Sequence, residues 1–167
     1  MESAVAMVGL FWITPEATYL GSPPAADGSC VRLSAAGLEV VDPERSRTWA
    51  WDELRAVAVE EVPRQGVAGR LSGMVESLVM TLGGGEGPPT MTLRVETRSG
   101  PERVQVYLAA AGGYSAEEEE LSQALLGRFV AGTADLRAME AWGREHGLEG
   151  TPKARVREEL LHSWAQV

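Results

Sequence analysis

The sequence predicts an α+β fold, in which a bent antiparallel sheet or open barrel of about seven strands is capped by one amphipathic helix and followed by a C-terminal helical hairpin. Short apolar runs separated by turn residues occupy roughly the first 110 residues. The apolar period then changes to that of a helix after Ser115, and the last thirty-odd residues carry a helical pattern of their own. We therefore divide the chain into a β domain, residues 1–132, and a two-helix mini-domain, residues 133–167.

The clearest strand pattern lies near residue 100. Apolar and polar residues alternate from Met91 to Glu96 and again from Val104 to Leu108, and Ser99–Glu102 reads as a turn, so a hairpin is expected. The other expected strands are 5–14 with 19–20, 31–33, 38–41, 47–51, 54–62 and 78–82. Gly83–Pro89 is interpreted as a hairpin tip, because it lacks the Lys-Ser/Thr ending of a phosphate loop and lies between strands.

A helix is expected to begin after Ser115 and to end at Gly132. Ser115 and Glu118 have the spacing of a capping box, and Glu117–Glu120 would complement the helix dipole. We interpret the four glutamates as a solvated helix start, since consecutive helical residues point in different directions and cannot converge on one metal ion. The apolar stripe expected to face the sheet is Leu121, Ala124, Leu125 and Phe129.

The order and number of these elements resemble a pleckstrin-homology-like (GRAM-like) domain. The resemblance implies a strongly bent sheet that forms an open barrel, with the last helix closing one end. A generic small β-barrel with one helix fits the same pattern and stays open as the alternative.

The C-terminal segment carries a Trp142-x-Arg144-Glu145-x-Gly147 stretch, a Lys153-Ala154-Arg155 triplet and a closing run with Trp164. It resembles the small DNA-binding domain of the actinobacterial nucleoid-associated xenogeneic silencers, and the resemblance covers about a fifth of the chain. In that family an Arg-Gly-Arg triplet enters the minor groove of AT-rich DNA. The residues that the resemblance implies for DNA binding are Arg144, Lys153, Ala154, Arg155 and Arg157. Trp142, Leu160 and Trp164 are expected to form the core of the hairpin.

The segment also departs from the family pattern. Lys153 replaces the first arginine, Ala154 replaces the central glycine, and residues 135–167 hold five basic and six acidic side chains, a local charge of −1. Thr151-Pro152 has the composition of an N-cap followed by a first helical residue, which would place the triplet on a helix instead of an extended arm. A helical docking unit, similar also to the peripheral subunit-binding domains of dehydrogenase complexes, is the alternative to DNA binding.

Composition restricts the partners. The net charge of −9 opposes attraction to nucleic acid or to anionic lipid, so a DNA contact would be weak and local. The apolar run near the N-terminus is too short to span a bilayer, and Cys30 is the single cysteine, so we expect a cytoplasmic protein without disulfides or membrane contact.

No catalytic or metal-binding set is expected. His146 and His162 are the two histidines of the chain, and neither has cysteine nearby. No serine lies in a Gly-x-Ser-x-Gly elbow, and Cys30 has no basic neighbour before Arg32. Trp12, Trp49 and Trp51 are interpreted as core side chains.

These observations predict a non-enzymatic interaction or regulatory protein of actinobacterial type, without a cofactor, that recognises a protein partner through its pleckstrin-homology-like domain. The alternative is a DNA-binding nucleoid-associated or transcription-regulating protein that acts through the C-terminal hairpin. The identity of the partner and the presence of a homo-oligomer stay open at this level.

Overall fold

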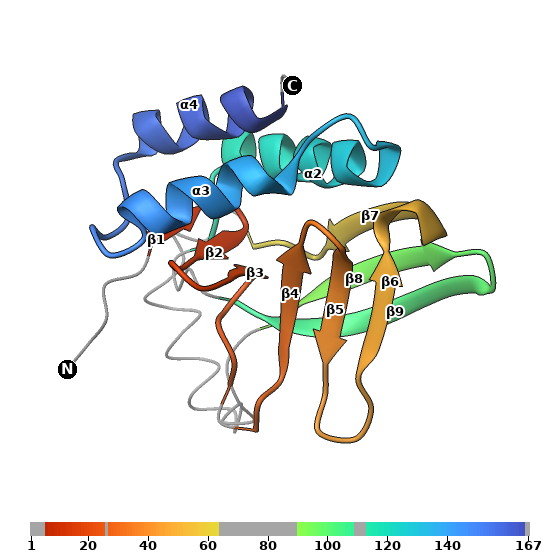
Figure 1. Cartoon of the computed structure of the whole chain (residues 1–167). Coiled ribbons are helices and arrows are strands. Elements are labelled where there is room, and N and C mark those ends of the chain that lie inside the picture. Colours follow the sequence, from red (N-terminus) through yellow and green to blue (C-terminus); the bar gives the residue numbers. More distant parts are fainter. Residues whose placement is uncertain (1–5, 26, 64–89, 109–112, 166–167) are drawn as a thin grey trace.

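The computed structural model describes residues 6–25, 27–63, 90–108 and 113–165. These residues form two antiparallel sheets and three helices, which confirms the α+β class, and within them the sheets are not closed into a barrel (Figure 1). The first sheet is a meander of six strands in the order β1-β2-β3-β4-β5-β6. These strands are Ala6–Val8, Phe11–Ile13, Thr18–Leu20, Cys30–Ser34, Gly37–Val41 and Arg47–Ala50.

The second sheet has three strands in the order β7-β8-β9, with bounds Leu54–Glu60, Thr90–Thr97 and Gly100–Tyr107. β8 and β9 form the predicted hairpin, in which Met91 pairs with Val106, Leu93 with Val104 and Val95 with Glu102. A single 3-10 turn, η1 (Trp51–Glu53), joins the two sheets. The expected strand at 78–82 and the loop at 83–89 lie outside the described residues.

The described part contains nine strands, more than the seven expected, partly because the N-terminal apolar run is not one strand. Residues 5–14 were expected to extend continuously, but β1 and β2 form a hairpin that turns at Gly9 and Leu10. Gly9 has φ +60°, a left-handed conformation that favours glycine, and it reverses the chain where the helix Ala116–Ala131 approaches. Trp49 and Trp51 also do not share a strand face, because β6 ends at Ala50 and η1 begins.

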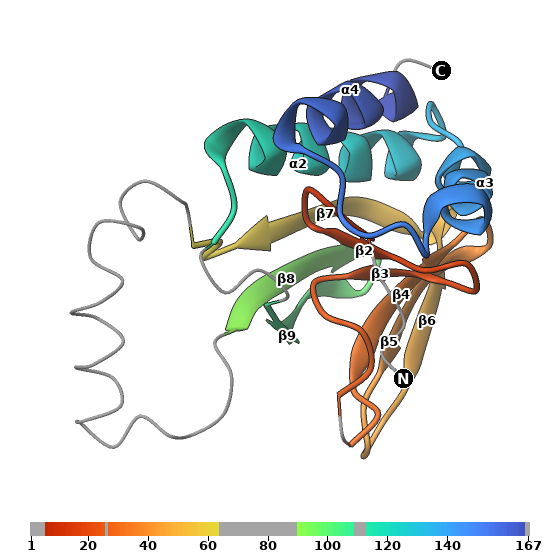
Figure 2. The same cartoon turned by 90° about the vertical axis from the view of Figure 1, so that its left-hand side faces the viewer.

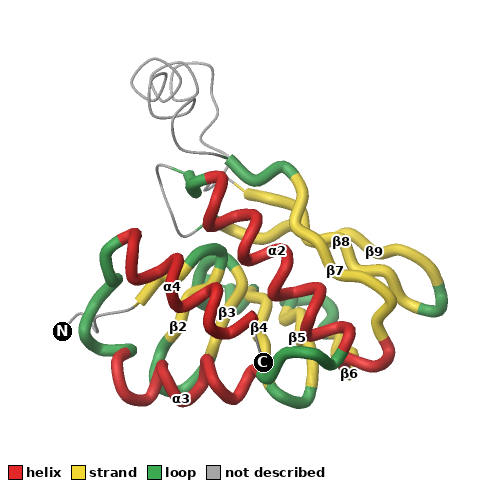
Figure 3. Tube along the Cα trace, turned by 90° about the horizontal axis from the view of Figure 1, so that it is seen from above, coloured by secondary structure: helices red, strands yellow, loops and turns green. Residues whose placement is uncertain are grey.

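The three helices form a layer over one side of the sheets (Figures 1 and 2). They are α2 (Ala116–Ala131), α3 (Leu136–His146) and α4 (Ala154–Ala165). From above, α2 crosses the layer, α4 lies beside it, and α3 lies at the edge near β2 and β3 (Figure 3). Gly143 of α3 meets the Thr14 carbonyl at a distance that leaves no room for a Cβ, so this glycine allows α3 to pack closely on the end of β2.

One hydrophobic cluster connects all of these elements. It contains residues of both sheets and of α2, and it also contains Leu136 and Met139 of α3 and Leu161 and Trp164 of α4. The helical hairpin therefore packs on the β domain in this structure. The division of the chain at residue 132 stays a prediction about independent folding.

Helix α2 begins and ends where the sequence predicted. Ser115 is the N-cap and its hydroxyl accepts a hydrogen bond from the Glu118 N–H at 3.1 Å, while Gly132 ends the helix in a left-handed conformation. The buried face differs from the expected stripe, because Ala124 is exposed and Leu126 is fully buried. The residues buried on α2 are Glu118, Ser122, Leu125, Leu126 and Phe129.

Phe129→Ala should destabilise the protein far more than Arg128→Ala. Phe129 is 3% exposed and its ring centroid lies 5.4 Å from that of Trp51, whereas Arg128 is exposed. Loss of a buried phenylalanine costs about 3–5 kcal/mol, and a surface change lies within roughly ±0.5 kcal/mol. Urea unfolding of the two variants measures the difference, and equal midpoints would contradict this packing of α2.

Candidate functional site

The Lys153-Ala154-Arg155 triplet lies at the start of α4. The Arg157 N–H donates to the Lys153 carbonyl at 3.0 Å, so Lys153 is the cap and Ala154 is the first helical residue. The helical alternative thus describes this structure better than an extended arm does, although α4 begins two residues after Pro152. Thr151 instead accepts a hydrogen bond from the Met7 N–H on β1, at 3.1 Å.

The basic side chains of this segment have different surroundings. Arg144 and Lys153 are exposed, and Arg155 pairs with Glu159 across one turn of α4 at 3.3 Å. Arg157 points inward and pairs with Glu118 of α2. The structure therefore does not gather the implied DNA-binding residues on one free surface.

Aromatic rings meet within the C-terminal hairpin. The Trp142 and Trp164 rings meet edge to face, with centroids 6.0 Å apart, and this contact joins α3 to α4. Trp164 is 5% exposed, while Trp142 and Leu160 are half-buried against the main core. The His146 ring is tilted against that of Trp142, with centroids 5.4 Å apart.

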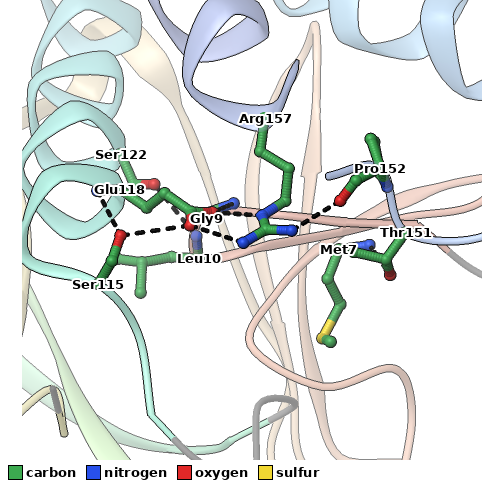
Figure 4. Close-up of polar contacts among 9 residues, drawn as sticks. All are labelled: Met7, Gly9, Leu10, Ser115, Glu118, Ser122, Thr151, Pro152 and Arg157. Atoms are coloured by element: carbon green, nitrogen blue, oxygen red, sulfur yellow. Dashed lines mark hydrogen bonds and ion pairs between the residues drawn. The ribbon is translucent and has the colours of Figure 1, made fainter. Parts of the chain in front are cut away.

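A buried polar cluster joins α2, α4 and the β1–β2 turn (Figure 4). The Arg157 guanidinium donates to both carboxylate oxygens of Glu118, at 2.8 and 2.9 Å, and also to the Pro152 carbonyl at 2.6 Å. Glu118 in turn accepts from the Gly9 N–H at 3.1 Å, and Ser122 accepts from the Leu10 N–H at 3.1 Å. Side chains of a helix more than one hundred residues away thus accept hydrogen bonds from the backbone N–H groups of the turn between β1 and β2.

The charges in this cluster stabilise each other. Burial alone would raise the pKa of Glu118, but the hydrogen bonds and positive charge of Arg157, with the Gly9 and Ser115 donors, hold that pKa below its ordinary value of 4.5. The same hydrogen bonds from Glu118 raise the pKa of Arg157 above its ordinary value. The Glu118 side chain is 7% exposed and that of Arg157 is 20% exposed, so solvent screens the pair only weakly.

The sequence analysis missed this role of Glu118, which it placed in a solvated acidic run. One signal was present, because Glu118, Ser122, Leu125 and Phe129 recur at helical spacing and therefore share one face. Nothing in the sequence pointed to Arg157 as the partner. The implied role of Arg157 in DNA binding stays untested, but its guanidinium is occupied within the protein.

A second candidate site is a groove of about 570 Å³ between the two sheets. β4, β5 and β6 cross in front of β8 and β9, and their lower ends project beyond β9 (Figures 1 and 2). The projecting sheet contributes Val31, Val40 and Arg47, and the edge of β9 contributes residues 103–107. We call this space the inter-sheet groove.

The inter-sheet groove has contacts between the two sheets near each end of β9, and it carries charge at its rim. The Ser22 N–H donates to the Tyr107 carbonyl at 3.0 Å, and Arg47 pairs with Glu102. Asp27 and Asp42 also line the groove, and within the described part of the chain neither forms an ion pair. The Ser29 N–H lowers the pKa of Asp27, so this carboxylate is ionised at neutral pH.

Comparison with known proteins identifies no relative: no family model, curated protein or solved structure matches the chain. Within residues 6–25, 27–63, 90–108 and 113–165, no three side chains of the His, Cys, Asp and Glu types are placed to hold a metal ion. None of the helices in the same ranges is both long and apolar enough to cross a membrane.

Arg157→Met should lower the free energy of unfolding by about 3 kcal/mol at pH 7, because it leaves the Glu118 carboxylate buried without its cation. The folded pKa of Glu118 is depressed, so the contribution of the pair is complete above pH 4.5 and is lost as the pH falls through the lowered value. The gap between wild type and variant in urea unfolding should therefore narrow in acid.

Arg155→Met is the matched control for Arg157→Met, since it removes an exposed pair with Glu159 from the same helix. It should change stability little at any pH. Equal effects of the two substitutions, or a gap that widens in acid, would contradict the role of the Glu118–Arg157 pair.

The double variant Lys153→Arg with Ala154→Gly should gain no affinity for AT-rich DNA over the wild type, which we expect to bind such DNA weakly. The reason is that both positions belong to the start of α4, where the backbone cannot extend into a narrow groove. Fluorescence anisotropy on AT-rich and GC-rich duplexes across a salt series measures the affinity. Tight, AT-selective binding by either protein would contradict this expectation.

Proposed function

We propose that this chain is a non-enzymatic, cytoplasmic module that recognises a protein partner, and that the partner binds in the inter-sheet groove. The observation that carries the proposal is the groove itself, in which the carboxylates of Asp27 and Asp42 and the half-buried Val104 lie beside the edge strand β9. The pleckstrin-homology-like resemblance is compatible with this use, because it implies a bent-sheet scaffold.

The chemistry near the groove favours recognition over catalysis. Both histidines of the chain lie on the helical hairpin, so neither can act as a general base in the groove. Burial raises the pKa of the Cys30 thiol, which keeps it protonated and weakly nucleophilic at neutral pH. Cys30 is also the single cysteine of the chain, in keeping with a reducing compartment.

DNA binding through the hairpin receives less support. Arg157 is paired with a buried carboxylate and Arg155 with an exposed one. The −9 net charge adds a repulsive field for phosphate. A protein partner with local positive charge would be attracted both by the net negative charge of the whole chain and by the carboxylates at the rim of the groove.

The test is affinity capture from cells of the native host with nuclease present, using the wild type and two double variants of equal charge change. Asp27→Lys with Asp42→Lys alters the rim of the groove. Glu16→Lys with Glu44→Lys alters exposed carboxylates that do not line it, and serves as the control. We expect a protein that the wild type and the control retain and that the groove variant loses.

Equal retention by the two double variants would contradict recognition in the groove. A protein that is captured without nuclease and lost when nuclease is present would instead favour the DNA-binding alternative. Circular dichroism and thermal unfolding of both double variants establish that the lost capture does not come from lost folding.

A further inference from the structure

The edge of β9 carries backbone groups that face the inter-sheet groove. Val104 and Val106 belong to the β8–β9 ladder, and the Tyr107 carbonyl points away from β8, where it accepts the Ser22 N–H. Backbone groups alternate in direction along an antiparallel strand, so those of Arg103 and Gln105 also point away from β8. Among the described residues, no backbone group pairs with these edge positions.

Pro101 agrees with this register. It occupies β9 opposite Glu96, two residues before Arg103, so a backbone N–H at this position would point away from β8. Proline is tolerated in a strand where its missing N–H would have faced outward. The outward pairing groups of β9 are therefore limited to the stretch from Arg103 to Tyr107, about 14 Å of extended chain.

Side chains contact two other sheet edges, those of β7 and β1. The Gln123 amide of α2 pairs with both the N–H and the carbonyl of Val59 on β7, at 2.9 and 2.5 Å. Thr151 meets the β1 edge through the Met7 N–H. Proteins commonly cover edge strands in this way, and β9 differs because its edge residues line the inter-sheet groove.

We propose that the partner of this protein presents an extended segment of about five residues, which adds to the second sheet as a fourth strand beside β9. The inference rests on the proposed function and specifies its mode. Every second side chain of the segment would lie beside Val104 and Val106, which share one face of β9, and the half-buried Val104 also lines the groove. A small aliphatic residue fits these positions.

Charge defines one end of the bound segment. Asp27 and Asp42 lie at the end of the groove formed by the loops beside β4 and β5, and neither is neutralised within the described residues. Arg47 lines the same groove, and it is already paired with Glu102. A lysine or arginine of the partner near the two aspartates would complement the groove, so the recognised pattern alternates aliphatic and polar residues and ends in a cation.

The probe is a phage-displayed library of random ten-residue peptides, selected on the full chain. We expect enrichment of alternating aliphatic residues with a flanking lysine or arginine. The enriched peptide is then measured by fluorescence anisotropy against Gln105→Pro and Gln105→Ala. Both substitutions remove the same side chain, which contacts Thr90 and Thr92, but only proline removes the outward N–H.

Gln105→Pro should bind the peptide about five- to tenfold more weakly than Gln105→Ala, since one backbone hydrogen bond is lost. A peptide N-methylated at alternate residues should lose binding to the wild type in one register and keep it in the other, which tests strand pairing without altering the protein. Thermal unfolding of both Gln105 variants checks that they remain folded.

The outcomes separate this inference from the proposed function. Equal peptide binding by the two Gln105 variants, together with equal binding of the N-methylated peptides, would overturn strand addition. If the Asp27→Lys, Asp42→Lys variant still failed to capture the partner protein, the proposed recognition in the groove would stand without strand addition. Selection of peptides without alternation would also overturn it. The selection could also enrich no peptide while sedimentation shows a dimer that Gln105→Pro weakens. The occupant of the groove would then be a second copy of this chain, and the proposal would be overturned.

Discussion

The arrangement of the helical layer depends on the ion pair between Glu118 and Arg157. This pair connects the first turn of α2 to α4, and the Glu118 carboxylate also holds the Gly9 N–H of the β1–β2 turn. A carboxylate this buried is unfavourable without its cation, so α4 cannot leave the surface without exposing or neutralising it. The pair therefore couples the C-terminal hairpin to the first two strands of the chain.

Gly9 makes that coupling geometrically feasible. An added Cβ would collide with the Ser122 hydroxyl and press on Leu161, and the left-handed φ further disfavours any other residue. The turn, the helix start and α4 thus meet at a point where the backbone itself is the contact surface. Small residues at this junction allow one hydrophobic core to extend from the sheets into the hairpin.

The inter-sheet groove has a different origin. The lower ends of β4–β6 project beyond β9, and the groove lies between them and the edge of that strand. The helices lie on another side of the molecule, where Gln123 of α2 contacts the edge of β7 and Thr151 of the α3–α4 loop contacts the edge of β1. The same fold that protects two edges consequently leaves strand-pairing groups of β9 beside the groove.

Local rules account for the elements that the sequence predicted. The β8–β9 hairpin follows from strict alternation around a turn, and α2 follows from the Ser115 cap and the Gly132 terminator, because these signals lie within a few residues of each other. The C-terminal pair of helices and the contact between Trp142 and Trp164 were predicted for the same reason. The first turn at Gly9 was missed, since its cause is a helix far along the chain.

The roles of the charged residues were decided only by tertiary structure. Glu118 and Glu117 are adjacent in one acidic run, yet one is buried and ion-paired while the other is exposed. Arg155 and Arg157 flank a single residue, and only the second turns inward. Sequence determined which residues are charged and where α2 begins and ends. Whether a given charge meets solvent, a partner or an opposite charge depended on how distant elements pack, because burial and electrostatic pairing are properties of that packing.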